Sequence, residues 1–174
     1  MKSSANRYDV PPLALWAALT AFPLLATFCF SAQDARASGS LSMRLLYWIL
    51  SVFPALRALE VGFLHALLRK LAHFTLYFAL GCGLRGLYTY QRRAPAVAGA
   101  LATAALCASL DEFHQTFSAG RAPSVFDVAL DTCGAASGCL LVSLLFSLLL
   151  TKEPCQEVKP WSISRLWKAR NPEN

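Results

Sequence analysis

Charged residues are scarce in this chain of 174 residues. Asp, Glu, Lys and Arg together make up 15% of it, whereas soluble domains carry about 25%. Hydrophobic residues make up 56%, and they are gathered in long runs rather than spread evenly. This composition excludes an ordinary soluble domain. It indicates a multi-pass membrane protein with room for one compact membrane domain.

The common signatures of metal sites and activated nucleophiles are also missing. The six cysteines form no C-x-x-C pair and no Cys/His spacing, so we expect neither a disulfide nor a zinc site. Walker A, G-x-S-x-G and H-E-x-x-H patterns do not occur. We therefore expect no cofactor and no metal, and the sequence leans against an enzyme.

Basic residues are in excess, since the net charge is +6. Nucleic-acid binding would need Lys and Arg on one solvent-exposed face. Here many of them flank apolar segments, where they set membrane topology and meet anionic lipid head groups. We therefore expect membrane lipid, and no nucleic acid, as a partner.

Four apolar runs have the length of about 20 residues that a helix needs to cross a bilayer. We predict spans at about residues 12–30, 71–90, 95–114 and 124–150. They leave a short N-terminus at 1–11 and a polar tail at 151–174. The predicted fold is all-α, a polytopic membrane four-helix bundle. The third span is rich in Ala and Gly, which allow close helix approach, so we expect it at the centre.

The segment between the first two spans, at 32–70, mixes polar and apolar residues. Residues 45–53 are apolar but too few to span as a helix. Tyr47 and Trp48 suit the depth of the lipid head groups. We predict an interfacial or re-entrant helix here, between the first and second spans.

Basic residues also predict the topology. With four spans, the N-terminus, the turn at 91–94 and the tail share one side of the membrane. That side carries more Lys and Arg than the other, so it should be cytoplasmic. The expected location is the bacterial inner membrane, with both termini cytoplasmic. The loop at 32–70 and the turn at 111–124 would then face outward.

Polar residues gather at three helix ends on this outward side. Charges at the edge of hydrocarbon are costly unless they face protein, water or a ligand, so such a cluster predicts a functional site. Spacings of three and four residues place several of them on shared helix faces. The candidate ligand-binding residues are Arg69, His73, Asp111, Glu112, His114, Gln115, Arg121, Ser124, Asp127 and Asp131.

Some of these residues also have a purely structural interpretation. Ser124 with Asp127 three positions later resembles a capping box at a helix start. Lys70 suits an interfacial anchor that reaches the head groups. Asp131 lies about two turns into its helix, beyond capping reach, so it should need a partner.

At these residues the chain resembles the VanZ-like family of small bacterial membrane proteins. The matching pieces are F-S-A-Q at 30–33, R-K-L-A-H-F at 69–74, D-E-F-H-Q-T-F at 111–117 and G-R-A-P-S-V-F-D-V-A-L-D-T-C-G-A at 120–135. The resemblance implies a VanZ-like membrane domain over residues 12–150. It also implies a place in the cell envelope, since the family's namesake is associated with low-level resistance to the antibiotic teicoplanin.

Three functions fit this pattern. The first is an envelope protein whose outward polar pocket binds an anionic head group or a peptidoglycan precursor, held by Arg121 and the amides that open the fourth span. The second is a lipid-linked phosphotransferase or hydrolase, in which the acids hold Mg²⁺ and His73 or His114 moves the proton. The third is a polar plug that only locks the bundle.

Overall fold

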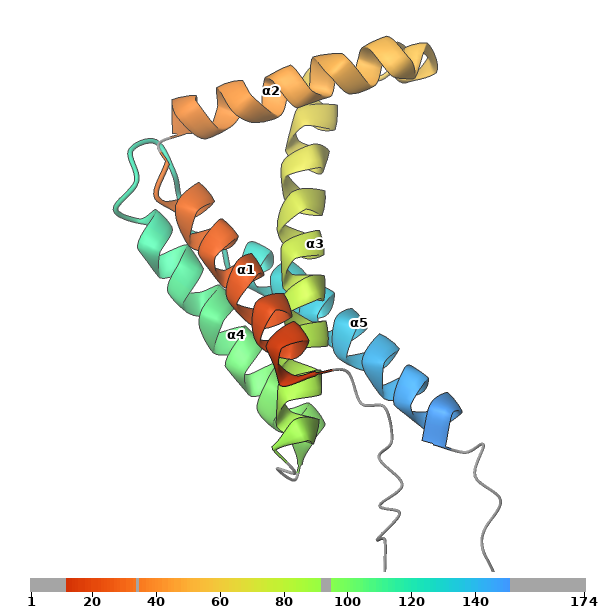
Figure 1. The fold of residues 1–174 in the computed structure, drawn as a ribbon. Helices are drawn as coiled ribbons and strands as arrows, with labels where there is room; N and C mark the ends of the chain where they lie inside the picture. The colour runs from red at the N-terminus through yellow and green to blue at the C-terminus, as the bar shows by residue number, and fades with distance from the viewer. Residues whose placement is uncertain (1–11, 34, 92–94, 151–174) are drawn as a thin grey trace, which may run out of the picture. The chain divides into compact units, whose positions relative to one another are not determined.

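The computed structural model describes residues 12–33, 35–91 and 95–150, and every regular element in these ranges is helical. The elements are α1 (Leu13–Ser31), α2 (Ala35–Val52), a short 3-10 helix η1 (Pro54–Ala58), α3 (Val61–Tyr90), α4 (Ala96–Gln115) and α5 (Val125–Leu150) (Figure 1). The all-α prediction is confirmed. The predicted N-terminus at 1–11 and tail at 151–174 lie outside the described residues.

Three helices of the described chain are long and apolar enough to cross a membrane. They are Leu13–Ser31, Ala96–Gln115 and Val125–Leu148, with 19, 20 and 24 residues. The helix that contains the predicted span at 71–90 is not among them, because α3 carries polar residues such as His73 and Arg85 along its length. The composition of the described helices therefore supports a membrane protein, and a fourth crossing stays a prediction.

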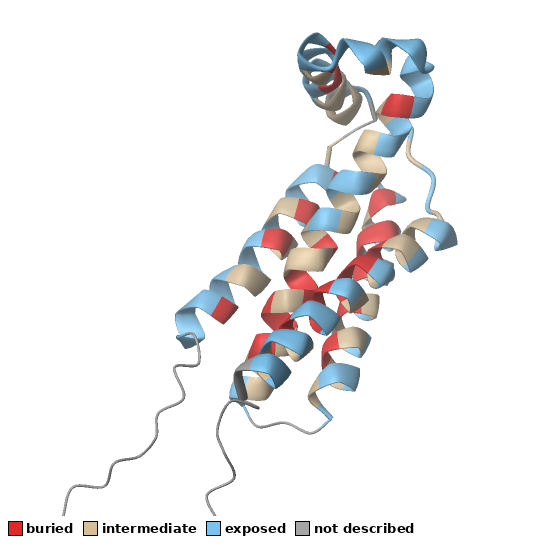
Figure 2. Cartoon of the chain, turned by 90° about the vertical axis from the view of Figure 1, so that its right-hand side faces the viewer, coloured by how far each residue is buried: buried red, intermediate tan, exposed pale blue. Residues whose placement is uncertain are grey.

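The contacts of α3 place it at the centre of the unit formed by Met1–Leu144. It packs against α1, α2 and α4, and its glycines meet the backbone of α5. The expectation that the Ala-rich third span would be central is wrong, because α4 buries mainly one stripe, Ala100, Ala104 and Ala108. Buried residues line the inner faces of these helices (Figure 2).

Close packing between α3 and α5 depends on glycine. A Cβ atom at Gly138 would collide with the carbonyl oxygen of Phe78, and one at Gly81 would collide with the backbone of Ala135. The Cys139 thiol donates to the carbonyl of Gly81 at 3.3 Å. Such small-residue contacts let two helix backbones touch, which is typical of helices packed in membranes.

The predicted short helix at 45–53 is part of a longer one. α2 runs over Ala35–Val52. The polar first half of this segment is also helical, and it extends the predicted apolar helix toward the N-terminus. Leu46 and Leu50 pack against Leu64 of α3. Tyr47 and Trp48 are exposed. The helix exists, and its place at the membrane interface stays a prediction.

A tight turn joins α4 to α5. Gly120 has φ 76°, a left-handed conformation that a side chain would disfavour. The turn lets α5 start beside the end of α4. The two helices therefore bring their polar ends together.

Candidate functional site

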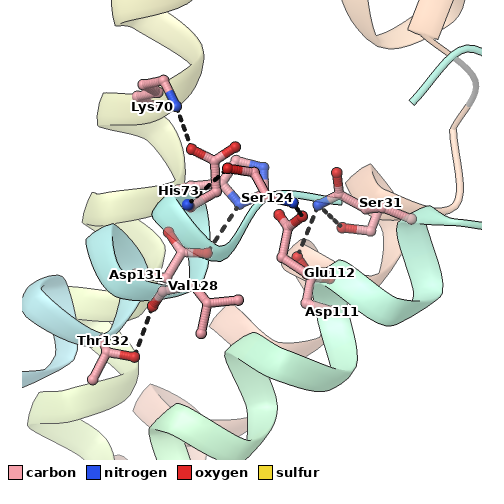
Figure 3. A network of polar contacts seen from close by, with 11 residues as sticks. Ser31, Lys70, His73, Asp111, Glu112, Ser124, Val128, Asp131 and Thr132 are labelled. Atoms are coloured by element: carbon pink, nitrogen blue, oxygen red, sulfur yellow. Dashed lines mark hydrogen bonds and ion pairs between the residues drawn. The ribbon is translucent and has the colours of Figure 1, made fainter. Parts of the chain in front are cut away.

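Polar side chains from four helices meet where α1 and α4 end and α5 begins (Figure 3). This group, the polar cluster, consists of Ser31, Lys70, His73, Asp111, Glu112, Gln115, Ser124, Asp127 and Asp131. On its α1 side, Gln115 Nε2 donates to Asp111 Oδ2 at 3.2 Å and to Ser31 Oγ at 3.4 Å. Ser31 and Gln115 are both buried, so this contact joins the ends of α1 and α4 away from solvent.

The turn before α5 is fastened to the end of α1. The Ser118 hydroxyl donates to the carbonyl of Ser31 at 2.7 Å. Arg121 Nη2 donates to the carbonyl of Phe30 at 3.0 Å. Both carbonyls belong to the last turn of α1, where carbonyl groups lack partners within the helix. Arg121 therefore caps the C-terminal end of α1, in addition to any role in ligand binding.

The start of α5 forms half of the predicted capping box. The backbone N–H of Asp127 donates to Ser124 Oγ at 3.3 Å, as a capping serine requires. The reciprocal bond is made by a different residue, because the N–H of Ser124 donates to Glu112 Oε2 at 2.8 Å. Glu112 is buried and links α4 to α5. Two amides that could hold an anion are thus already engaged within the protein.

Asp127 is free to turn toward α3 because Glu112 takes its place in the cap. Its carboxylate pairs with Lys70 Nζ, and the same ammonium lies 5.1 Å from the centre of the Phe126 ring. For Lys70 the sequence favoured an interfacial anchor over a role in the site. The structure adds it to the polar cluster, and its signal in the sequence was its position three residues before His73.

Asp131 is the most deeply buried acid of the polar cluster. Its exposed fraction is 1%, and neither carboxylate oxygen has a hydrogen-bond partner within the described chain. His73 Nδ1 lies 3.6 Å from Asp131 Oδ2, which is longer than a hydrogen bond. Asp131 was predicted to need a partner, and the residue beside it is His73. At this distance His73 does not form a hydrogen bond to the carboxylate.

A cavity of about 260 Å³ opens beside these residues. It is lined from α3, α4, the turn and α5, and most of the predicted site residues border it. Those residues are Arg69, His73, Glu112, Gln115, Arg121, Asp127 and Asp131. Lys70 also lines it, whereas Ser124 contributes only through its contacts with Glu112 and Asp127. The structure therefore brings these side chains into one space, and their binding role stays a prediction.

Asp111 and His114 border a different space. A second cavity of about 390 Å³ is lined mainly by apolar residues of α1 and α4, with these two polar side chains among them. The His114 ring stacks on Phe28, with ring centres 4.8 Å apart and planes at 6°. The shared helix face predicted for Asp111, His114 and Gln115 is thus divided between two cavities.

Ser31 was absent from the predicted site, although it is buried and bonded to Gln115. Serine at a helix end is common in any protein, so composition alone does not single it out. The only signal for Ser31 was the F-S-A-Q piece at 30–33, which contributes to the family resemblance and contains no charged residue. A search for charged residues alone therefore does not find Ser31.

These features define a class: an all-helical protein of membrane type with a buried polar cluster among its helices. Comparison with family models then places the chain. The VanZ/LLP1 family model matches residues 12–147. The chain belongs to this family, as the resemblance at the polar residues predicted. Searches of curated proteins and of solved structures gave no match.

Proposed function

We propose that this protein acts in the bacterial inner membrane by binding an anionic head group, of a lipid or a peptidoglycan precursor, in the 260 Å³ cavity. The observation that supports the proposal most directly is the position of Arg69. It lines the cavity, and it makes no hydrogen bond or ion pair with any other residue of the described chain. Guanidinium groups bind phosphate oxygens in pairs, which suits such a head group.

The other cations of the cavity are committed to internal contacts. Lys70 pairs with Asp127, and Arg121 donates to the carbonyl of Phe30. A ligand that used either cation would have to compete with these contacts. Arg69 would therefore make the first contact with the anion, and the amides of α5 would contribute less than the sequence suggested.

The arrangement in the membrane is a further part of the proposal. The segment at 71–90 runs beside α1, since Gly86 lies against Trp16, and Gly83 against Leu19 and Thr20. If α1 crosses the bilayer, this half of α3 lies at the same depth. We infer four crossings in a four-helix bundle, with α2 at the interface and the cavity on the outward side.

Lipid binding by purified protein tests the role of Arg69. Native mass spectrometry with phosphatidylglycerol and with neutral phosphatidylcholine would compare the wild type with Arg69→Gln. We expect Arg69→Gln to weaken phosphatidylglycerol binding at least about tenfold, because it loses a charge-assisted contact. Arg44→Gln is the matched control, since Arg44 is exposed on α2 and does not line the cavity. Equal behaviour of the two variants would contradict the proposal.

An envelope phenotype gives a second test. If the family's association with teicoplanin extends to this chain, expression should raise the teicoplanin concentration that a susceptible bacterium tolerates. Arg69→Gln and Asp131→Asn should remove that effect at unchanged protein level. A polar plug makes the opposite prediction, because substitutions would lower the amount of folded protein while any protein that remains keeps full effect.

A further inference from the structure

The geometry of the polar cluster points to a second binding event beside the cavity, at a group of which two members line this cavity and the third borders the apolar one. We infer that His73, Asp111 and Asp131 form a site for one divalent transition-metal ion, of the zinc or manganese type. This inference goes beyond the proposed head-group binding, and it can be tested with metal alone.

The main argument is the unsatisfied carboxylate of Asp131. Three of the four acids in the cluster have a donor: Asp111 accepts from Gln115, Glu112 from Ser124, and Asp127 pairs with Lys70. Asp131 is 1% exposed, yet both of its oxygens lack a hydrogen-bond donor within the described chain. His73 Nδ1 lies 3.6 Å from Asp131 Oδ2, too far to donate a hydrogen bond. Burying a carboxylate without a hydrogen bond costs several kcal/mol. A bound cation would remove this cost.

The second argument is the position of the donor atoms. One nitrogen of His73 and one oxygen each of Asp111 and Asp131 lie within 4.8 Å of one another. In tetrahedral coordination with bonds of about 2.1 Å, two ligand atoms of one ion lie about 3.4 Å apart. Side-chain rotations that close the widest separation in the group by about 1.4 Å would therefore allow all three atoms to bind one ion.

The kind of donor selects the kind of metal. Imidazole suits zinc and other transition metals, and carboxylates suit both these ions and magnesium. A set of one histidine and two aspartates therefore favours Zn²⁺ or Mn²⁺ over Mg²⁺ and Ca²⁺, which prefer sites made only of oxygen. Because His73 and Asp131 also line the cavity, the ion would lie beside the space where a head group is proposed to bind.

The three ligands come from three helices. His73 belongs to α3, Asp111 to α4 and Asp131 to α5. A single ion would therefore cross-link helices that are separate in the sequence. Metal binding should raise the thermal stability of the folded protein, because the ion binds the folded state and not the unfolded chain.

Metal titration of the full-length protein in detergent tests the inference. After treatment with EDTA and its removal, isothermal titration calorimetry with Zn²⁺ and Mn²⁺ should show one ion per chain. Mg²⁺ and Ca²⁺ should bind at least about tenfold more weakly. Loss of a group that only supports a ligand costs about 10–100-fold in affinity. His73→Gln and Asp131→Asn should therefore each lose at least that much.

The control is Glu60→Gln, which removes an exposed acid at the start of α3, outside the polar cluster. It should keep metal affinity within about threefold of the wild type, because Glu60 lies outside the three-residue set. Thermal melts with and without Zn²⁺ show whether each variant is folded, and His73→Gln serves if Asp131→Asn does not fold. The inference is overturned if the wild type binds no ion or if Glu60→Gln loses as much affinity as Asp131→Asn.

Discussion

At the scale of single residues, the acids of the polar cluster differ in how much of the fold depends on them. Glu112 is buried and accepts a backbone N–H at the start of α5. Asp127 pairs with Lys70, and both side chains are partly open to solvent, at 35% and 42%. Exposed ion pairs contribute about 0–1 kcal/mol, whereas a buried donor left without its acceptor costs about 1–3 kcal/mol.

The substitution Glu112→Ala should therefore destabilise the folded protein by about 1–3 kcal/mol, because the N–H of Ser124 loses its acceptor. Unfolding in mixed detergent micelles, followed by circular dichroism, would measure this. Glu112→Gln is the matched control, since its amide oxygen can still accept the bond, and it should lose less than half as much. Equal losses would mean that the charge of Glu112, and not the hydrogen bond, stabilises the start of α5.

The substitution Lys70→Met should change the free energy of unfolding by less than about 2 kcal/mol. It breaks a partly exposed ion pair and the contact of the Lys70 ammonium with the Phe126 ring, and each contributes about 1 kcal/mol or less at an exposed site. The same unfolding measurement applies. A loss above about 2 kcal/mol would show that the Lys70–Asp127 pair is effectively buried, for example by lipid.

At the scale of helices, the packing of α3 on α5 depends on positions without side chains. A methyl group at Gly138 would collide with the backbone of Phe78 on α3. Gly138→Ala should therefore force the two helices apart and lower the free energy of unfolding by about 1–3 kcal/mol or more. Gly39→Ala in α2 is the control. No atom lies within 4 Å of its new methyl group, and alanine favours helix. It should be neutral or slightly stabilising, and similar losses in both variants would contradict this account.

The helices and the grouping of polar residues were accessible from sequence because they depend on local patterns. Long apolar runs predicted α1, α4 and α5, and the predicted topology placed the acids of α4 and α5 on the same side as His73. The first half of α2 was missed because Ser38, Gly39 and Ser40 carry no periodic apolar signal. The central position of α3 was missed because it depends on which glycines meet another backbone, which is a property of the assembled helices.

The partners of individual acids could not be predicted for the same reason. Ser124 and Asp127 fit a capping box in the sequence, and only the packed structure gives the N–H of Ser124 to Glu112 and the carboxylate of Asp127 to Lys70. Hydrogen bonds between helices depend on rotations about the helix axes, and spacing along one helix does not determine them. Sequence therefore identified which residues gather, and the structure identified how they pair.

At the scale of the whole molecule, the decisive question is whether α3 crosses the membrane. The three helices that qualify by composition alone would put the two termini on opposite sides, whereas four crossings put them on the same side. The half of α3 at 71–90 packs beside α1 through Gly83 and Gly86. If α1 lies in the bilayer, the half of α3 that packs beside it lies at the same depth, and this is the reason we predict four crossings.

Reporter fusions in a bacterial host distinguish the two topologies. A fluorescent protein that folds only in the cytoplasm should be fluorescent when fused to either end of the full chain, because Lys and Arg favour the cytoplasmic side for both termini. Alkaline phosphatase, which is active only outside the cytoplasm, should be active when fused after Gly120, in the turn that joins α4 to α5. Fluorescence at the N-terminus alone, together with inactive phosphatase after Gly120, would show that α3 does not cross the membrane.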